Sequence, residues 1–391
     1  ENNLEVRYDW PVGAPGRWWI DVARADIFRY RGLLPVANLE LAAPLRVGRT
    51  PLYPAPRLGQ RAGLNNLFLK DDGQNPSASF KDRAGAVALV RARETGVSVI
   101  SGASTGNAGS SMACLAASVA MPCVIFVPET APAAKIAQLL VFGAHVFAVR
   151  GTYDDAFDLC MAVCRERGWF NRNTGHNPFT REGKKTASFE MYEQLGRIPD
   201  WVVVPTGDGN ILAGIWKGFR DLQEAGIVER TPKMLCAQSE ASGAISGAVW
   251  ELQKAGGGRP DWSQVRVAPV SAATVADSIS VDVPRDGLAA VRAVMESGGA
   301  AVTVADDAIL AAIPELARGA GVFAEPAAAC AWAGLEKAAA AGIVGADETV
   351  VCMSTGNGLK DIASARKAAG EPVSLENSVD AALAATEAIG R

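Results

Sequence analysis

Residues 201–214 read WVVVPTGDGNILAG. The first five are apolar without alternation, which is typical of a parallel strand that is covered on both faces. A glycine-rich turn follows, and then a helical pattern begins. Other apolar runs with the same character are LFLK at 67–70, VSVI at 97–100, CVIFV at 123–127, HVFAV at 145–149, MLCAQ at 234–238 and TVVCM at 349–353. Because Ala-rich helical segments separate these runs, the sequence predicts a doubly wound α/β fold.

Composition excludes several classes of protein. The chain has 391 residues, room for roughly two domains, and 38 basic against 42 acidic residues give a net charge of −4. With no tract of Lys or Arg, we expect no nucleic-acid partner. The most apolar stretch, at 110–128, is interrupted by Pro122, so we expect no membrane span. The start of the chain does not resemble a signal peptide, and we expect a cytoplasmic protein.

Cys160 and Cys164 would lie one helical turn apart, but neither of the two histidines is near them in the sequence. We therefore expect no metal site, and we expect the seven cysteines to be reduced and buried.

Three glycine-rich turns follow predicted strands, at 101–110, 205–214 and 353–361. In a doubly wound sheet ligands bind beyond the carboxyl ends of the strands, where N–H groups at helix N-termini attract anions. Each turn taken alone could be an ordinary strand-to-helix connection. Three of them in one chain, each with Asn or Thr beside glycine, favour a binding site. Nucleotide motifs fit poorly, because GDGN at 207–210 lacks the third glycine of a dinucleotide fingerprint and REGKKT at 181–186 lacks the start of a P-loop.

A fourth segment, DDGQNPSASFKDRAGA at 71–86, places Lys81 near a predicted helix N-terminus. This end of a helix favours anions, so burial against Phe80 would push the Lys81 amine towards its neutral, nucleophilic form. The alternative is an exposed lysine that pairs with Asp82. The segment alone does not decide between these two interpretations.

Together the four segments resemble the fold-type II pyridoxal-phosphate enzymes, and most of all the threonine synthases among them. NPSASFKDR at 75–83 is similar to the segment that carries the cofactor lysine. STGNAG at 104–109, PTGDGN at 205–210 and STGNGLKD at 354–361 are similar to three loops of that family. Further matches are GRTPL at 48–52, NPFTREGKKT at 177–186, TVADSI at 274–279 and VFAEPAAA at 322–329. The resemblance covers residues 27–365.

The resemblance implies a role for each matched residue. Lys81 would carry pyridoxal 5'-phosphate covalently and act as the catalytic base. Asn107 would donate to the ring's phenolic oxygen, the loop 207–210 would surround the cofactor phosphate, and Thr355 would bond to the pyridine nitrogen. The residues implied around the cofactor are Phe80, Lys81, Asn107, Gly207, Asp208, Gly209, Asn210 and Thr355.

The substrate carboxylate would bind the N–H groups of Ser104, Thr105 and Gly106. The implied substrate is O-phospho-L-homoserine, whose phosphate needs a second cationic pocket. Here the chain departs from the family, since Thr180 stands where the family often has arginine and Arg181 is displaced by one residue. The candidates for this pocket are Arg181, Lys184 and Ser79, followed by Ser77, Arg83 and Lys185.

The implied reaction is conversion of O-phospho-L-homoserine and water to L-threonine and phosphate by a pyridoxal-phosphate-dependent lyase. The departure at Thr180 leaves two alternatives open, a β-eliminating deaminase acting on threonine or serine and a β-replacement enzyme.

For domains, we predict an N-terminal segment at 1–55 that packs on the larger domain. A smaller α/β domain at 56–195 would carry the lysine, and a larger one at 196–391 the phosphate loop. The cofactor would lie between the domains of a homodimer that acts on a small amino-acid substrate.

Overall fold

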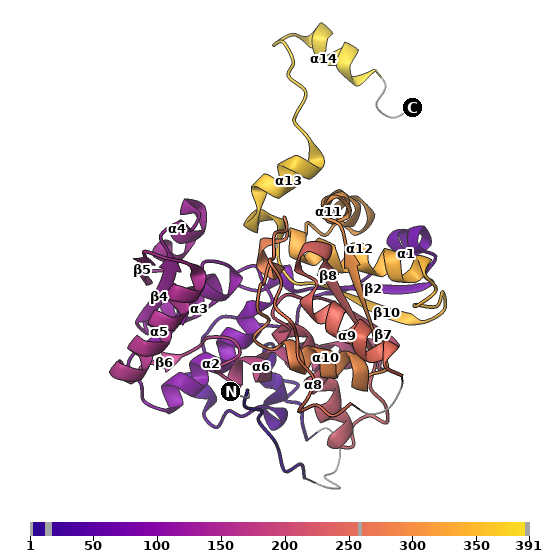
Figure 1. Ribbon diagram of the computed structural model, residues 1–391. Helices are drawn as coiled ribbons and strands as arrows, with labels where there is room; N and C mark the ends of the chain where they lie inside the picture. Colours follow the sequence, from indigo (N-terminus) through magenta and orange to yellow (C-terminus); the bar gives the residue numbers. More distant parts are fainter. Residues whose placement is uncertain (1–2, 12–17, 257–259, 388–391) are drawn as a thin grey trace.

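The computed structural model describes residues 3–11, 18–256 and 260–387. It contains two sheets (Figure 1). The larger sheet has the order β1-β2-β10-β7-β8-β9, and all its neighbours are parallel except β1 and β2. Its strands are β1 (Leu52–Pro54), β2 (Asn66–Asp71), β7 (Trp201–Pro205), β8 (Lys233–Ser239), β9 (Ala300–Val304) and β10 (Thr349–Ser354). The smaller sheet is parallel, with the order β5-β4-β3-β6. Its strands are β3 (Ile100–Ala103), β4 (Cys123–Pro128), β5 (His145–Val149) and β6 (Phe170–Asn171).

Helices cover both faces of each sheet. On the larger sheet, α8 and α10 pack together on one face with α9, while α12 lies on the other face beneath α11. On the smaller sheet, α5 packs on one face of β3 and β4, and α3 packs on the other face. Helices α2 and α4 pack against α3. The helices are α1 (Pro56–Ala62), α2 (Lys81–Glu94), α3 (Asn107–Ala117), α4 (Ala133–Val141), α5 (Tyr153–Arg167), α6 (Phe179–Lys184), α7 (Thr186–Leu195), α8 (Asn210–Glu224), α9 (Ala244–Lys254), α10 (Gly287–Glu296), α11 (Asp306–Ala320), α12 (Pro326–Ala340), α13 (Ile362–Ala369) and α14 (Val379–Thr386).

Strand β7 shows why its sequence has no alternation. Val202 and Val204 belong to the apolar cluster under α8, whereas Trp201 and Val203 belong to the cluster under α12. All four side chains are buried, so both faces of the strand require apolar residues. The predicted doubly wound α/β fold is confirmed.

The sheets divide the chain differently from the expected domain boundaries. Strand β2, at Asn66–Asp71, lies in the larger sheet, although we expected residues from 56 onward to belong to the smaller domain. The N-terminal segment also contacts more than the larger domain. Ile27 and Phe28 pack with Val87 and Val90 of α2, which expose less than 1% of their surface.

Strand β3 begins at Ile100, at the end of the run predicted for it, and includes Ser101, Gly102 and Ala103. Its register beside β4 places the following loop at the carboxyl edge of the smaller sheet.

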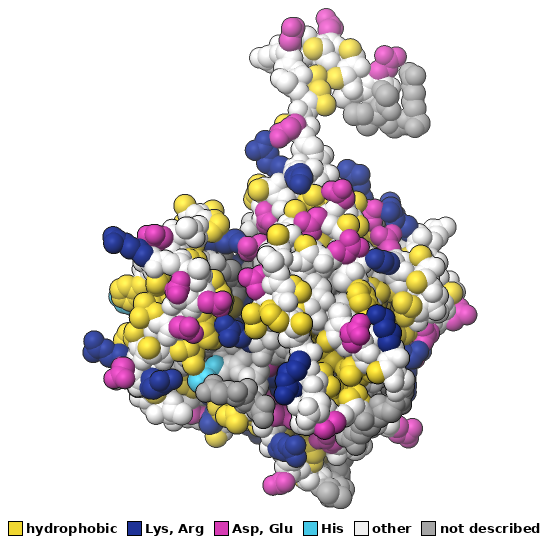
Figure 2. All heavy atoms as spheres, in the orientation of Figure 1, with side chains coloured by type: hydrophobic (Ala, Val, Ile, Leu, Met, Phe, Trp, Pro, Cys, Tyr) yellow, Lys and Arg dark blue, Asp and Glu magenta, His cyan; other side chains and the backbone are white. Residues whose placement is uncertain are grey.

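The surface carries charges of both signs, and Figure 2 shows them interspersed over one face. Helix α13 packs on α11, and the C-terminal segment with α14 extends away from the two sheets (Figure 1). None of the described helices is long and apolar enough to cross a membrane.

Candidate active site

Lys81 is the first residue of α2, and the turn before it is tied to the end of β10. The N–H of Phe80 donates to the carbonyl oxygen of Thr355 at 2.8 Å, and Ser79 forms an antiparallel bridge with Gly356. Phe80 is fully buried, and the Ser79 hydroxyl is buried without a hydrogen-bond partner. Backbone pairing therefore brings two motifs together that lie far apart in the sequence.

The residue Lys81 as a whole is partly buried. Among the described residues, none accepts a hydrogen bond from its Nζ. Burial lowers the pKa of Lys81; Asp208 opposes that shift, Arg172 adds to it, and Glu325 again opposes it. The lowered pKa increases the neutral, nucleophilic fraction of the amine at neutral pH.

The loop at 207–209 connects β7 to α8. Within the described part of the chain, its three backbone N–H groups have no acceptor. Gly209 has a φ of +91°, and a Cβ there would lie 2.7 Å from the carbonyl oxygen of Asp286. Free N–H groups at the start of a helix of this length form an anion site.

The Asp208 carboxylate turns back along this loop and accepts the N–H of Asn210 at 3.0 Å. Burial alone would raise the pKa of Asp208, but Lys81, Lys184 and the Asn210 N–H together hold it below its ordinary value. Asp208 therefore stays ionised beside the amine.

The loop at 104–106 connects β3 to α3. The backbone N–H groups of these residues have no acceptor among the described residues. A Cβ on Gly106 would meet no atom within 4 Å, so open space lies beside the loop. Free N–H groups beside open space suit an anion such as a carboxylate.

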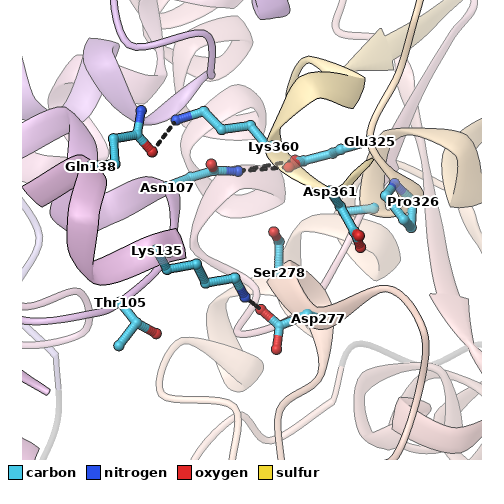
Figure 3. A pocket seen from close by; sticks show the side chains of 12 residues that line it. Thr105, Asn107, Lys135, Gln138, Asp277, Ser278, Glu325, Pro326, Lys360 and Asp361 are labelled. Atoms are coloured by element: carbon cyan, nitrogen blue, oxygen red, sulfur yellow. Dashed lines mark hydrogen bonds and ion pairs between the residues drawn. The ribbon is translucent and has the colours of Figure 1, made fainter. Parts of the chain in front are cut away.

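The next residue, Asn107, points across to the larger sheet. Its side-chain amide donates to both carboxylate oxygens of Glu325, at 2.9 and 3.1 Å (Figure 3). Burial raises the pKa of Glu325, while the bond from Asn107 opposes that rise.

Two further contacts bridge the pocket in Figure 3, and each joins α4 to a residue that follows β7 in the chain. Lys135 pairs with Asp277, and Lys360 donates to Gln138 at 3.2 Å. Thr105 and Ser278 also line this pocket.

Arg181 and Lys184 lie on α6 and are already bonded inside the protein. Arg181 pairs with Asp286 at 2.7 Å, and Lys184 donates to the side chain of Asn210, which in turn bonds to Asp286. Burial first, and then the charge of Lys81, holds the pKa of Lys184 well below its ordinary value. This network fixes α6 against the start of α8.

Three other candidate ligands for the substrate phosphate are engaged in bonds to described residues inside the protein, which leaves them no free donor directed at a substrate pocket. Arg83 is fully buried and bonds to Asp72 and Glu190. Lys185 pairs with acidic side chains of α6 and α8 at 2.6 Å. The hydroxyl and N–H of Ser77 both donate to Asp82 at 2.6 Å.

Two residues of the site were not assigned a role from the sequence. Glu325 lies within VFAEPAAA, so its motif was a signal, but its pairing with Asn107 spans 218 positions. Arg172 follows β6 and had no motif at all. Its Nε and Nη2 atoms are buried without a partner.

The residues present fit pyridoxal phosphate. The site offers an amine without an acceptor at Lys81, a loop of free N–H groups at 207–209 for a phosphate, and a buried Thr355 whose hydroxyl has no partner among the described residues. Within the described ranges, no group of three or more His, Cys, Asp or Glu side chains could hold a metal ion.

Comparison with known proteins agrees with this chemistry. Residues 44–356 match the family described as "Pyridoxal-phosphate dependent enzyme". The chain is 37% identical to a threonine synthase of Methanocaldococcus jannaschii, over 90% of this chain and 84% of that protein. It is also 37% identical to a threonine synthase of Methanosarcina acetivorans, over 97% and 91%.

Solved structures show the same fold at lower identity. The processed form of threonine deaminase isoform 2 from Solanum lycopersicum superposes with a TM-score of 0.71 at 22% identity, covering 92% of this chain and 98% of that one. A diaminopropionate ammonia lyase from Escherichia coli gives 0.68 at 16% identity, covering 84% and 88%. With the lysine, the loops and these matches in agreement, the chain belongs to the fold-type II family of pyridoxal-phosphate-dependent enzymes.

Proposed function

We propose that this protein is a threonine synthase, which converts O-phospho-L-homoserine and water into L-threonine and phosphate. The observation that carries the proposal is the 37% identity to curated threonine synthases over at least 90% of the chain. The deaminase structures, at 22% identity or less, support the fold alone.

Lys81 is the proposed base. When bound, pyridoxal phosphate supplies an electron sink that acidifies the substrate's Cα proton. Loss of a γ-phosphate requires protons to leave Cα and then Cβ, so the base must act more than once. The lowered pKa of Lys81 favours a neutral amine that can accept these protons.

The two glycine-rich loops are proposed to hold different anions. The N–H groups at 207–209 would hold the cofactor phosphate, and those at 104–106 the substrate carboxylate. Thr355 would face the pyridine nitrogen, and Phe80 would keep water from the lysine. The side-chain amide of Asn107 donates to Glu325 in this structure, and we propose that it would be directed to the bound cofactor.

The test compares substrates on the purified holoenzyme. We expect inorganic phosphate and threonine to form in equal amounts from O-phospho-L-homoserine. Lys81→Ala should abolish both, whereas Lys254→Ala, which removes an exposed lysine, should leave them unchanged. Keto-acid release from threonine or serine, without phosphate release from the phosphorylated substrate, would overturn the proposal.

One observation favours a second candidate, a deaminase or β-replacement enzyme that acts on an unphosphorylated or differently substituted amino acid. Thr180 is fully buried, and its hydroxyl donates to the carbonyl oxygen of Asn177 at 2.9 Å. It cannot supply the positive charge that the family's arginine would bring to a substrate phosphate. The substrate comparison separates the two candidates.

A further inference from the structure

Arg172 stands at the carboxyl edge of the smaller sheet, one residue beyond β6. Its backbone N–H donates to the carbonyl oxygen of Ser101 on β3 at 2.8 Å. The loop at 104–106 begins at the end of that same neighbouring strand. Adjacent strands lie about 4.8 Å apart. Arg172 therefore emerges beside the loop that would hold the substrate carboxylate.

The guanidinium of Arg172 is buried but unpaired. The residue is only 3% exposed, and its Nε and Nη2 atoms have no hydrogen-bond partner. Arg83, which is also buried, uses all three of its nitrogens in bonds to Asp72, Glu190 and neighbouring hydroxyls. A buried cation without partners is costly, and such a group in a native protein calls for an explanation.

The charges around Arg172 are those of the active site. Its charge helps to lower the pKa of Lys81 and of Lys184. Burial lowers the pKa of Arg172 itself to about 10, and Tyr153, Asp208 and Asp82 oppose that shift, so it stays charged at neutral pH. The carboxylates are already occupied, since Asp208 accepts from Asn210 and Asp82 from Ser77.

The hydroxyl of Tyr153, another neighbour of Arg172, donates to the carbonyl oxygen of Ala103 at 3.2 Å, next to the loop at 104–106. The guanidinium of Arg172 thus lies near Lys81 and the loops at 207–209 and 104–106. It is a cation that the internal bonds of the protein do not neutralise.

We propose that Arg172 is the specificity-determining residue that binds the phosphate of a phosphorylated amino-acid substrate. It would take the place of the cation that Thr180 does not supply. A guanidinium binds a phosphate through two parallel N–H bonds, which suits the two free nitrogens. This inference rests on the proposed function, because it names the group that would distinguish phosphohomoserine from threonine or serine.

The experiment uses the holoenzymes of Arg172→Gln and Arg172→Lys. The matched control is Arg165→Gln, which removes an exposed arginine from α5. We measure KM and kcat for phosphate release from O-phospho-L-homoserine. We also measure the inhibition constant of 2-amino-5-phosphonopentanoate, an analogue that cannot lose its phosphonate. Cofactor content, cofactor affinity and thermal midpoint are measured on each variant.

We expect Arg172→Gln to raise both KM and the inhibition constant about 10- to 100-fold, the range expected for lost charge-assisted hydrogen bonds. Arg172→Lys should recover part of that loss, because lysine keeps the positive charge but cannot donate two parallel N–H bonds. Cofactor affinity should not change, and Arg165→Gln should behave as wild type.

Two results overturn the inference. One is an unchanged KM and inhibition constant in Arg172→Gln. The other is a loss of cofactor affinity with unchanged phosphonate binding, which would assign Arg172 to the cofactor. If Arg172→Gln does not fold, Arg172→Lys decides by the same comparison.

Failure of the proposed function gives a different result. A wild-type enzyme that releases no phosphate, but binds the phosphonate by calorimetry in an Arg172-dependent way, would refute the threonine synthase reaction and support the phosphate subsite.

Discussion

Replacing Glu190 by Gln should destabilise the helix that begins at Lys81. Glu190, on α7, is 1% exposed and accepts bonds from Arg83 at 2.7 and 2.8 Å, from Lys70 at 2.7 Å and from the N–H of Arg49 at 2.7 Å. The amide would leave two buried cations undercompensated, which costs about 3–5 kcal/mol. A chain of 391 residues gains roughly 0.8 kcal/mol/K of unfolding entropy, so the thermal midpoint should fall by about 4–6 °C.

The assay is thermal unfolding of the holoenzyme, with Glu224→Gln as the control. Glu224 pairs with Arg220 at 2.7 Å on an exposed face of α8, and losing that pair should cost at most about 1 kcal/mol. If Glu190→Gln shifts the midpoint no more than this control at pH 7, the buried network does not stabilise the fold as argued.

The pH dependence gives the same prediction a second test. Burial alone would raise the pKa of Glu190, but Arg83 and Lys70 hold it far below its ordinary value. Its contribution is therefore fully present above the unfolded pKa of about 4.3 and is lost as the pH falls below it. The difference between wild type and Glu190→Gln should shrink on acidification, and a difference that grows would refute the reasoning.

Three further predictions concern the site. The apoenzyme should bind pyridoxal phosphate at a rate that rises with pH, and the midpoint of that rise should lie below 10.5 because the pKa of Lys81 is lowered. Stopped-flow absorbance measures this rate, and a midpoint at or above 10.5 would contradict the prediction. Gly209→Ala should weaken cofactor binding at least about tenfold in equilibrium dialysis, since its φ is +91° and the new Cβ would lie 2.7 Å from the oxygen of Asp286; unchanged affinity would count against the loop's role. Gly183→Ala should cost about 1–3 kcal/mol in thermal unfolding, because its Cβ would meet the carbonyl oxygen of Arg83 at 1.9 Å where α6 crosses α2; an unshifted midpoint would show that the helices can separate freely.

The sequence predicted most strands but not the composition of the sheets. Strand β7 was visible because both its faces are apolar. Strand β3 extends through Ser101 and Gly102, whose low strand propensity is overridden by burial between β4 and β6. Strand β9, at Ala300–Val304, is not among the predicted apolar runs, because two of its five residues are alanines and two glycines precede it. The membership of β2 in the larger sheet depends on its pairing with β10, which no local pattern encodes.

For the candidate site, motifs identified the loops but not the bonds between them. The segments around Lys81 and Thr355 meet through a backbone bond. The expectation that charged residues of NPFTREGKKT are free for a substrate did not allow for Asp286, which pairs with Arg181 from a region without a motif. Arg172 could not be singled out, because an arginine after a strand becomes unusual only when its partners are seen to be missing.

The short antiparallel pairing of Ser79 with Gly356 has a mechanical consequence. It attaches the reactive amine to the frame of the larger sheet, which also carries the loop at 207–209, whereas the loop at 104–106 and Arg172 are attached to the smaller sheet. A rotation of the smaller sheet would leave the amine and that phosphate cradle stationary relative to each other. The same rotation would move the loop at 104–106 and Arg172 towards the amine or away from it. Contacts with the substrate would then change while the amine and the loop at 207–209 keep their relative positions.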